Sequence, residues 1–164
     1  MTEINFYKTQ PESLIRILCK ISEKCYYSNL NALVITKNRD YSSSLDKSLW
    51  TYSKNHFIPH ATIDDPLPEK QPILITDKIH NPNKAQIIIF VNPAQQILVE
   101  STAQHNESMI NQMIKIIFIL DETNMIQTVE IKNIIDMSKI VYSQINYFIR
   151  NIQGTWQNIT PNNH

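Results

Sequence analysis

Four short runs of the sequence have uninterrupted apolar centres, and they constrain the fold more than any other feature. They are residues 31–37 (NALVITK), 71–77 (QPILITD), 85–92 (AQIIIFVN) and 115–121 (KIIFILD). A strand without polar alternation has both faces buried, which is typical of a parallel sheet covered by helices on both sides. A further strand is predicted at residues 4–8, where INFYK alternates.

The segments between these strands predict helices and loops. Residues 11–29 and 39–52 carry apolar residues at helical spacing. Residues 54–72 contain prolines and aspartates and predict a loop, and residues 93–106 predict a polar connection. A long helix is predicted over roughly 124–153, because apolar residues recur there at steps of three or four. These residues are Ile134, Met137, Val141, Ile145, Phe148 and Ile152. The pattern indicates a doubly wound α/β fold.

Glycine is almost absent, and this excludes the usual nucleotide sites. The only glycine is Gly154, so the strand-to-helix turns YKTQPES and TKNRDYSS contain none. Dinucleotide enzymes and P-loop NTPases use glycines in such turns, because phosphate must approach the backbone amides closely. We therefore expect no nucleotide cofactor.

The charge balance excludes other classes of protein. Lys and Arg together number 15, as do Asp and Glu, so the chain has no net positive charge. We therefore expect no direct sequence-specific binding of nucleic acid. Neither a charged-then-apolar leader nor an apolar run of 18 residues is present, which predicts a cytoplasmic protein without a membrane contact.

No local pattern predicts a metal or catalytic site. His56 and His60 are four residues apart, but Pro59 prevents the helix that would bring them together around a metal. Cys19 and Cys25 are expected to be inert thiols. Nucleophile motifs such as G-x-S-x-G are absent, so no catalytic residue is predicted.

Two segments have open interpretations. Trp50, Phe57 and Ile58 either complete the core against the second helix or, being displaced from its apolar stripe, form anchors for another protein. On the predicted terminal helix, the side opposite the apolar stripe is either a solvated face or a pocket for an acidic, extended peptide. This second side carries Lys139, Tyr142, Ser143, Asn146 and Arg150.

The sequence resembles the chi subunit family of the bacterial DNA polymerase III holoenzyme. The resemblance rests on INFY near the start, on QPILITD and on IIIFVN. It rests above all on an L-W followed by F-x-P-H, which is Leu49–Trp50 followed by residues 57–60. It covers residues 1–92 well, and the later strand and terminal segments follow in the expected order.

The resemblance implies a single-domain, Rossmann-like fold over residues 1–160, with a short polar tail at 161–164. It implies a non-catalytic adaptor of DNA replication, without a cofactor, that docks a psi-like subunit or a helicase and binds the acidic C-terminal tail of single-stranded-DNA-binding protein. The docking residues it implies are Leu49, Trp50, Phe57, Pro59 and His60. The tail residues it implies are Lys139, Tyr142, Ser143 and Arg150, where Ser143 replaces a cation usual in the family, so weaker tail binding is expected. The alternative is a small α/β enzyme or nucleotide-binding protein that has diverged from this family.

Overall fold

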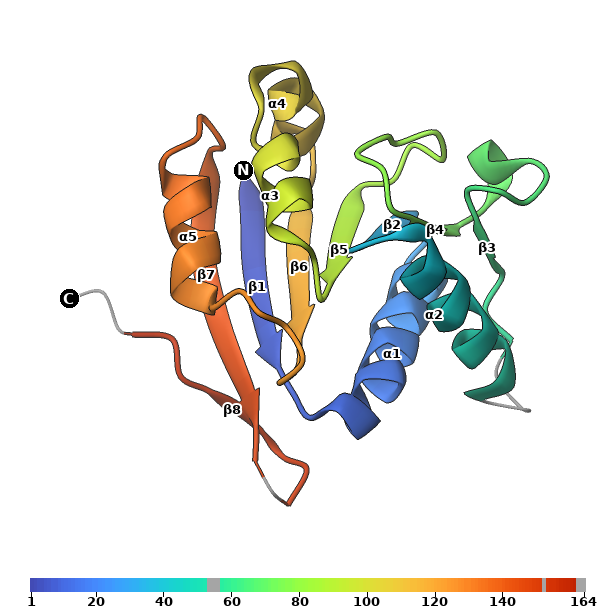
Figure 1. Cartoon of the computed structure of the whole chain (residues 1–164), viewed down its shortest axis with the longest axis horizontal. Coiled ribbons are helices and arrows are strands. Elements are labelled where there is room, and N and C mark those ends of the chain that lie inside the picture. Colours follow the sequence, from blue (N-terminus) through green and yellow to red (C-terminus); the bar gives the residue numbers. More distant parts are fainter. Residues whose placement is uncertain (53–56, 152, 162–164) are drawn as a thin grey trace.

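A computed structural model describes residues 1–52, 57–151 and 153–161 of the chain. Its strands form one eight-stranded sheet in the order β3-β4-β2-β5-β6-β1-β7-β8, which can be followed from right to left in Figure 1. Neighbouring strands are parallel except for β7 and β8, which are antiparallel. The strands are β1 (Thr2–Lys8), β2 (Ala32–Thr36), β3 (His60–Thr62), β4 (Ile73–Thr76), β5 (Ile87–Val91), β6 (Lys115–Leu120), β7 (Tyr142–Arg150) and β8 (Trp156–Asn158). The predicted α/β class with a mostly parallel sheet is confirmed.

Helices cover both faces of the central strands of this sheet. On one face α1 (Leu14–Tyr27) and α2 (Arg39–Tyr52) pack on the apolar side chains of β2, β4 and β5. On the other face α3 (Gln95–Ser101), α4 (Gln104–Asn111) and α5 (Thr128–Asp136) enclose a second core, and Figure 1 shows them over β7, β1 and β6. Two short 3₁₀ helices, η1 (Pro11–Ser13) and η2 (Pro68–Lys70), precede α1 and β4. None of the described helices is long and apolar enough to cross a membrane.

A ladder of aromatic rings crosses four strands on the face covered by α5. Phe90, Phe118, Phe6 and Tyr147 occupy paired positions on β5, β6, β1 and β7. Their ring centroids are 5.0, 4.7 and 5.1 Å apart in that order, with nearly parallel planes. Cross-strand aromatic pairs of this kind stabilise a sheet and fix its register. The ladder thereby places β7 beside β1.

The long helix predicted over 124–153 is wrong. Helix α5 ends at Asp136, and residues 142–150 form β7. Met137 and Val141, predicted to face the sheet from that helix, are 89% and 57% exposed. Tyr147 packs toward α5 while Phe148 stacks on Tyr7 on the opposite face, which is the period of a strand. Ile152 lies outside the described residues.

The physical reason is that residues 142–150 (YSQINYFIR) are rich in aromatic and β-branched side chains, which favour a strand. Their apolar positions fit a helical period of three to four as well as a strand period of two, and packing decides between them. Two smaller predictions also change. The polar connection at 93–106 contains α3 and the start of α4, and the loop at 54–72 contains β3.

Candidate partner-binding sites

Two large aromatic side chains form an exposed corner where α2 ends and β3 begins. Trp50 is 49% exposed and Phe57 is 65% exposed, and their ring centroids are 5.4 Å apart. Leu49 and Pro59 are half-buried beneath and beside them, and Leu49 packs against the core under α1 and α2. The five predicted docking residues therefore do come together. We call these five residues, Leu49, Trp50, Phe57, Pro59 and His60, the Trp50 corner.

His60 is the buried support of this corner. Its ring lies 4.3 Å from that of Trp50. Its Nδ1 is 2.7 Å from the Ile58 carbonyl oxygen, and its Nε2 is 3.5 Å from Asp46 Oδ1. Because both nitrogens have local polar neighbours and the ring is buried, His60 holds the Trp50 ring from below and is not itself available to a partner. His56 lies outside the described residues.

Asp46 is a residue of this site that the sequence reasoning missed. Asp46 precedes Trp50 by one helical turn on α2, so their side chains are neighbours, and the Trp50 side chain is one of the groups that lower the pKa of Asp46. Burial raises the pKa of Asp46 above its ordinary value, and the nearby His60 offsets part of that rise. The i, i+4 spacing of an acceptor and an indole donor was the signal that could have identified it.

The two open interpretations of the aromatic segment apply to different residues. Ile58 is buried in the core beneath α1 and α2, as the core interpretation predicts. Trp50 and Phe57 keep about half or more of their side-chain surface in solvent. Exposed, mutually packed aromatics beside a proline are typical of protein interfaces. Their role as anchors stays a prediction.

The predicted tail-binding residues do not form one site. Lys139 is exposed just before β7, and Tyr142 and Ser143 begin that strand. Arg150 ends the same strand, about 26 Å away at the rise of an extended chain. It is paired with Trp156 of β8, and its Nε donates to the Gly154 carbonyl oxygen at 3.1 Å. Arg150 therefore belongs to a different part of the molecule, because the predicted helix that would have placed it near Tyr142 is a strand.

A groove between α5, β7 and the segment after β8 lies beside Tyr142. It has a volume of about 580 Å³, and we call it the α5–β7 groove. Apolar parts of its wall come from Val129 on α5, from Ile145 and Tyr147 on β7, and from Ile159. Val129 and Ile159 are both substantially exposed. The groove is therefore large enough, and apolar enough, for one side chain of a bound peptide with its flanking backbone.

One cation lines the α5–β7 groove. Lys132 of α5 forms an ion pair with Asp136 one turn later, and the Tyr142 hydroxyl donates to Asp136 Oδ1 at 2.7 Å. The hydrogen bonds from Lys132 and Tyr142 lower the pKa of Asp136 below its ordinary value. The hydrogen bond between Tyr142 and Asp136 also raises the pKa of Tyr142. Sequence reasoning missed Lys132 because it placed α5 and Tyr142 on one continuous helix.

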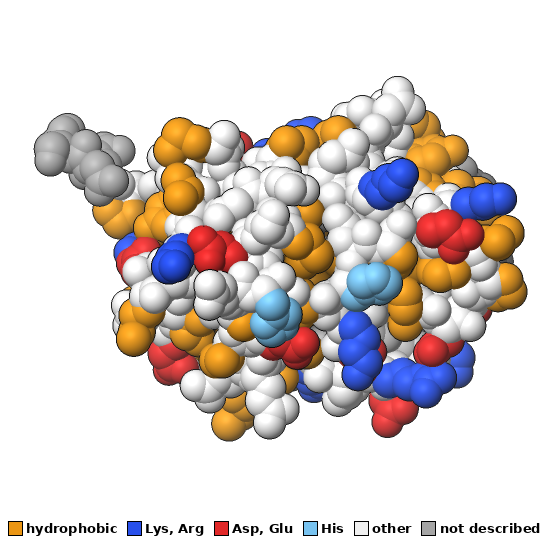
Figure 2. Space-filling model, turned by 90° about the horizontal axis from the view of Figure 1, so that it is seen from above, with side chains coloured by type: hydrophobic (Ala, Val, Ile, Leu, Met, Phe, Trp, Pro, Cys, Tyr) orange, Lys and Arg blue, Asp and Glu red, His pale blue; other side chains and the backbone are white. Residues whose placement is uncertain are grey.

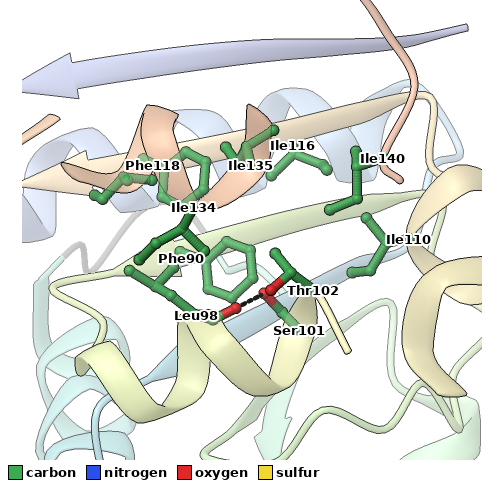
Figure 3. A pocket seen from close by; sticks show the side chains of 11 residues that line it. Phe90, Leu98, Ser101, Thr102, Ile110, Ile116, Phe118, Ile134, Ile135 and Ile140 are labelled. Atoms are coloured by element: carbon green, nitrogen blue, oxygen red, sulfur yellow. Dashed lines mark hydrogen bonds between the residues drawn. The ribbon is translucent and has the colours of Figure 1, made fainter. Parts of the chain in front are cut away.

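The cavity inside the apolar core offers little room for chemistry. The void between α3, α5 and the sheet has a volume of about 10 Å³, and Figure 3 shows it closed by apolar side chains, with Ser101 donating to the Leu98 carbonyl oxygen. Within the described residues, no group of three or more His, Cys, Asp or Glu side chains could hold a metal. On the face shown in Figure 2, Lys and Arg side chains are interspersed with Asp and Glu.

Both cysteines are buried and free. Burial raises the pKa of the Cys25 thiol to about 11, and that of Cys19 is also raised by burial. A thiol with a raised pKa carries almost no thiolate near neutral pH, and the thiolate is the reactive form. This protonation state agrees with the inert thiols expected from the sequence.

Comparison with known proteins gives a consistent result. Residues 1–128 match the family described as DNA polymerase III chi subunit, HolC. The chain is 33% identical over 159 residues to a probable DNA polymerase III subunit chi of Rickettsia prowazekii (strain Madrid E), covering 97% of this chain and 93% of that protein. It is also 25% identical over 68 residues to the DNA polymerase III subunit chi of Pseudomonas aeruginosa, covering 40% and 48% of the two chains. The first relative extends across α5, β7 and β8, beyond the residues that the family match covers.

Proposed function

Because the chain belongs to the DNA polymerase III chi subunit family, we propose that it is a non-catalytic adaptor of the replication machinery. It links the clamp-loader assembly, through a psi-like subunit or a helicase, to single-stranded-DNA-binding protein. Its two partners bind the Trp50 corner and the α5–β7 groove, respectively.

The separation of these two surfaces carries the proposal. The Trp50 corner lies at the end of α2 beside β3, and the groove lies over β7. Strands β3 and β7 are near opposite edges of the sheet, six inter-strand spacings or about 29 Å apart. Partners on the two surfaces do not compete for space, which is the requirement for a linker.

The chemistry of the Trp50 corner supports the docking role. Truncation of aromatic anchors dominates the energetics of many interfaces, and an anchor that is already held in place loses little side-chain entropy on binding. Trp50 packs on the ring of the buried His60, which limits its movement. Phe57 stands beside it with most of its ring in solvent.

The chemistry of the groove supports tail binding at one end of β7. An acidic peptide that ends in an apolar residue needs an apolar slot and a nearby cation. Val129, Ile145 and Tyr147 supply the slot and Lys132 supplies the cation. Lys139 precedes the strand and adds a second, exposed cation. Arg150 takes no part in this revised site.

A titration of the tail peptide tests the tail arm of the proposal. A fluorescein-labelled peptide with the last nine residues of the organism's single-stranded-DNA-binding protein is titrated with the protein at 50 and 300 mM salt, with anisotropy as the readout. Binding is expected to be micromolar and weaker at high salt, because exposed charges are screened beyond about 8 Å at physiological ionic strength.

Three variants locate the site in the same assay. Lys132→Glu and Tyr142→Ala should each weaken binding several-fold, and Lys139→Glu should weaken it less. Trp50→Ala is the matched control and should leave peptide affinity unchanged. Salt-independent binding, or full affinity in both Lys132→Glu and Tyr142→Ala, would place the tail elsewhere on the molecule.

A further inference from the structure

Asp136 stands between the two polar groups of the α5–β7 groove that suit an acidic ligand. One of its carboxylate oxygens accepts the Tyr142 hydroxyl proton at 2.7 Å, and the other pairs with the Lys132 ammonium. Asp136 is exposed, so its carboxylate is free to move away without leaving a buried charge. Asp136 does not itself line the groove, but its carboxylate occupies the polar groups of two residues that do, Tyr142 and Lys132.

We propose that Asp136 is an internal competitor that a carboxylate of the bound peptide displaces from Tyr142 and Lys132. This inference rests on the proposed tail binding and assigns a regulatory residue to that site. Asp136 sets a threshold for binding, since a ligand must offer a carboxylate that replaces the existing contacts. A purely apolar peptide, or one with amides in place of carboxylates, cannot make the exchange.

The limited donor capacity of Tyr142 makes the contacts exclusive. A phenol has one proton to donate, so its hydroxyl cannot donate to Asp136 and to a ligand carboxylate at the same time. Lys132 has three donors and can contact both carboxylates, but its single positive charge is already balanced by Asp136. With Asp136 in place, the Lys132–Asp136 pair presents no net charge to an approaching acidic peptide.

Position on α5 distinguishes this role from simple helix stabilisation. A Lys–Asp pair at i, i+4 on an exposed helix surface contributes little to folding. Here, however, the pair also reaches across to β7 and holds the hydroxyl of a groove residue. A residue that served only to orient Tyr142 and Lys132 would strengthen peptide binding, whereas a competitor weakens it. The two roles predict opposite effects of the same substitution.

The test measures the labelled tail peptide on Asp136→Asn in the full-length protein. Asparagine keeps the size of the side chain and removes its charge, and we expect binding about two- to fivefold tighter than in the unaltered protein, the range typical of one exposed ion pair. Glu130→Gln is the matched control, because Glu130 is an exposed acid on the same helix. It should change affinity by less than the Asp136→Asn substitution does.

A second background tests the exchange itself. Tyr142→Phe keeps the ring but removes the hydroxyl that donates to Asp136. In this background Asp136 no longer competes for that hydroxyl, so the gain in peptide affinity from Asp136→Asn should be smaller. A peptide with its aspartates replaced by asparagines and its C-terminus amidated should show no gain with Asp136→Asn. Thermal unfolding followed by circular dichroism checks that each variant is folded.

The outcomes separate this inference from the function on which it rests. If Lys132→Glu and Tyr142→Ala do not affect the peptide, the groove is not the tail site and the proposed function loses that arm. If they do weaken binding but Asp136→Asn leaves affinity unchanged or lowers it, the site stands and the competitor role of Asp136 is refuted. A gain that is equal in the Tyr142→Phe background, or equal to that of Glu130→Gln, also refutes it.

Discussion

Truncation of either exposed aromatic at the Trp50 corner should weaken docking strongly while leaving the fold intact. A phenylalanine side chain carries about 200 Å² of surface, so an exposure of 65% leaves about 130 Å² of Phe57 for a partner. At about 25 cal/mol per Å², covering that area contributes about 3 kcal/mol, or roughly a hundredfold in affinity. Trp50 is less exposed but larger, and leads to a similar figure.

The same areas predict a small effect on folding. About 70 Å² of Phe57 is buried in the free protein, so Phe57→Ala should lower the free energy of unfolding by no more than about 2 kcal/mol. Binding to the purified psi-like partner is measured by isothermal titration calorimetry, and unfolding by urea titration. We expect Phe57→Ala and Trp50→Ala to lose about two orders of magnitude in affinity while both remain folded.

Trp156→Ala is the matched control for this experiment. Trp156 is an exposed tryptophan on β8, at the opposite edge of the sheet from β3. Its truncation should leave docking unchanged. Full docking by Phe57→Ala and Trp50→Ala would refute the anchor role. Loss of the cooperative urea transition in both would show that the two rings are core residues.

Three further predictions concern the core and the support of the corner. Phe118→Ala removes the ring at the centre of the aromatic ladder and should cost about 3–5 kcal/mol of unfolding free energy in urea titrations; a cost below 1 kcal/mol would mean that the ladder does not stabilise the sheet. Asp46 has a raised pKa in the folded state, so stability should fall as pH rises from 3.8 through that pKa; Asp46→Asn should lack this fall when urea midpoints are compared at pH 4 and 7. Cys25, with a pKa of about 11, should react with a thiol reagent at neutral pH only as fast as the protein opens; rapid labelling of the native protein would contradict its burial.

The first two-thirds of the fold could be predicted because burial on both faces leaves a distinct pattern. Residues 31–37, 71–77, 85–92 and 115–121 contain β2, β4, β5 and β6 within them, and each of these strands is buried almost throughout. A helix with such an apolar sequence would be apolar all round and would need other helices or strands packed on every side of it. The strand interpretation was therefore the only economical one.

The last third could not be predicted because β7 is only half-buried. Its side chains alternate between the core under α5 and a face without a helix, and the resulting mixture of apolar and polar residues also fits a helical stripe. The error changed the candidate site. Exposure of Trp50 and Phe57 depended on local spacing and could be anticipated, whereas the meeting of Lys132 with Tyr142 depends on how α5 returns across β7 and could not.

The position of β1 in the sheet has a consequence for how the protein is made. Residue 4 of β1 lies between residue 116 of β6 and residue 145 of β7, so β1 leaves the ribosome long before either of its partner strands. During most of translation this strand is an unpaired edge, and such edges are prone to intermolecular pairing. Pairing between distant residues also slows folding, because the connecting chain must first be closed into a loop. A nascent chain that stops before β7 therefore exposes a strand that the finished protein buries at its centre, and premature truncation should produce insoluble protein even though most of the sheet is present.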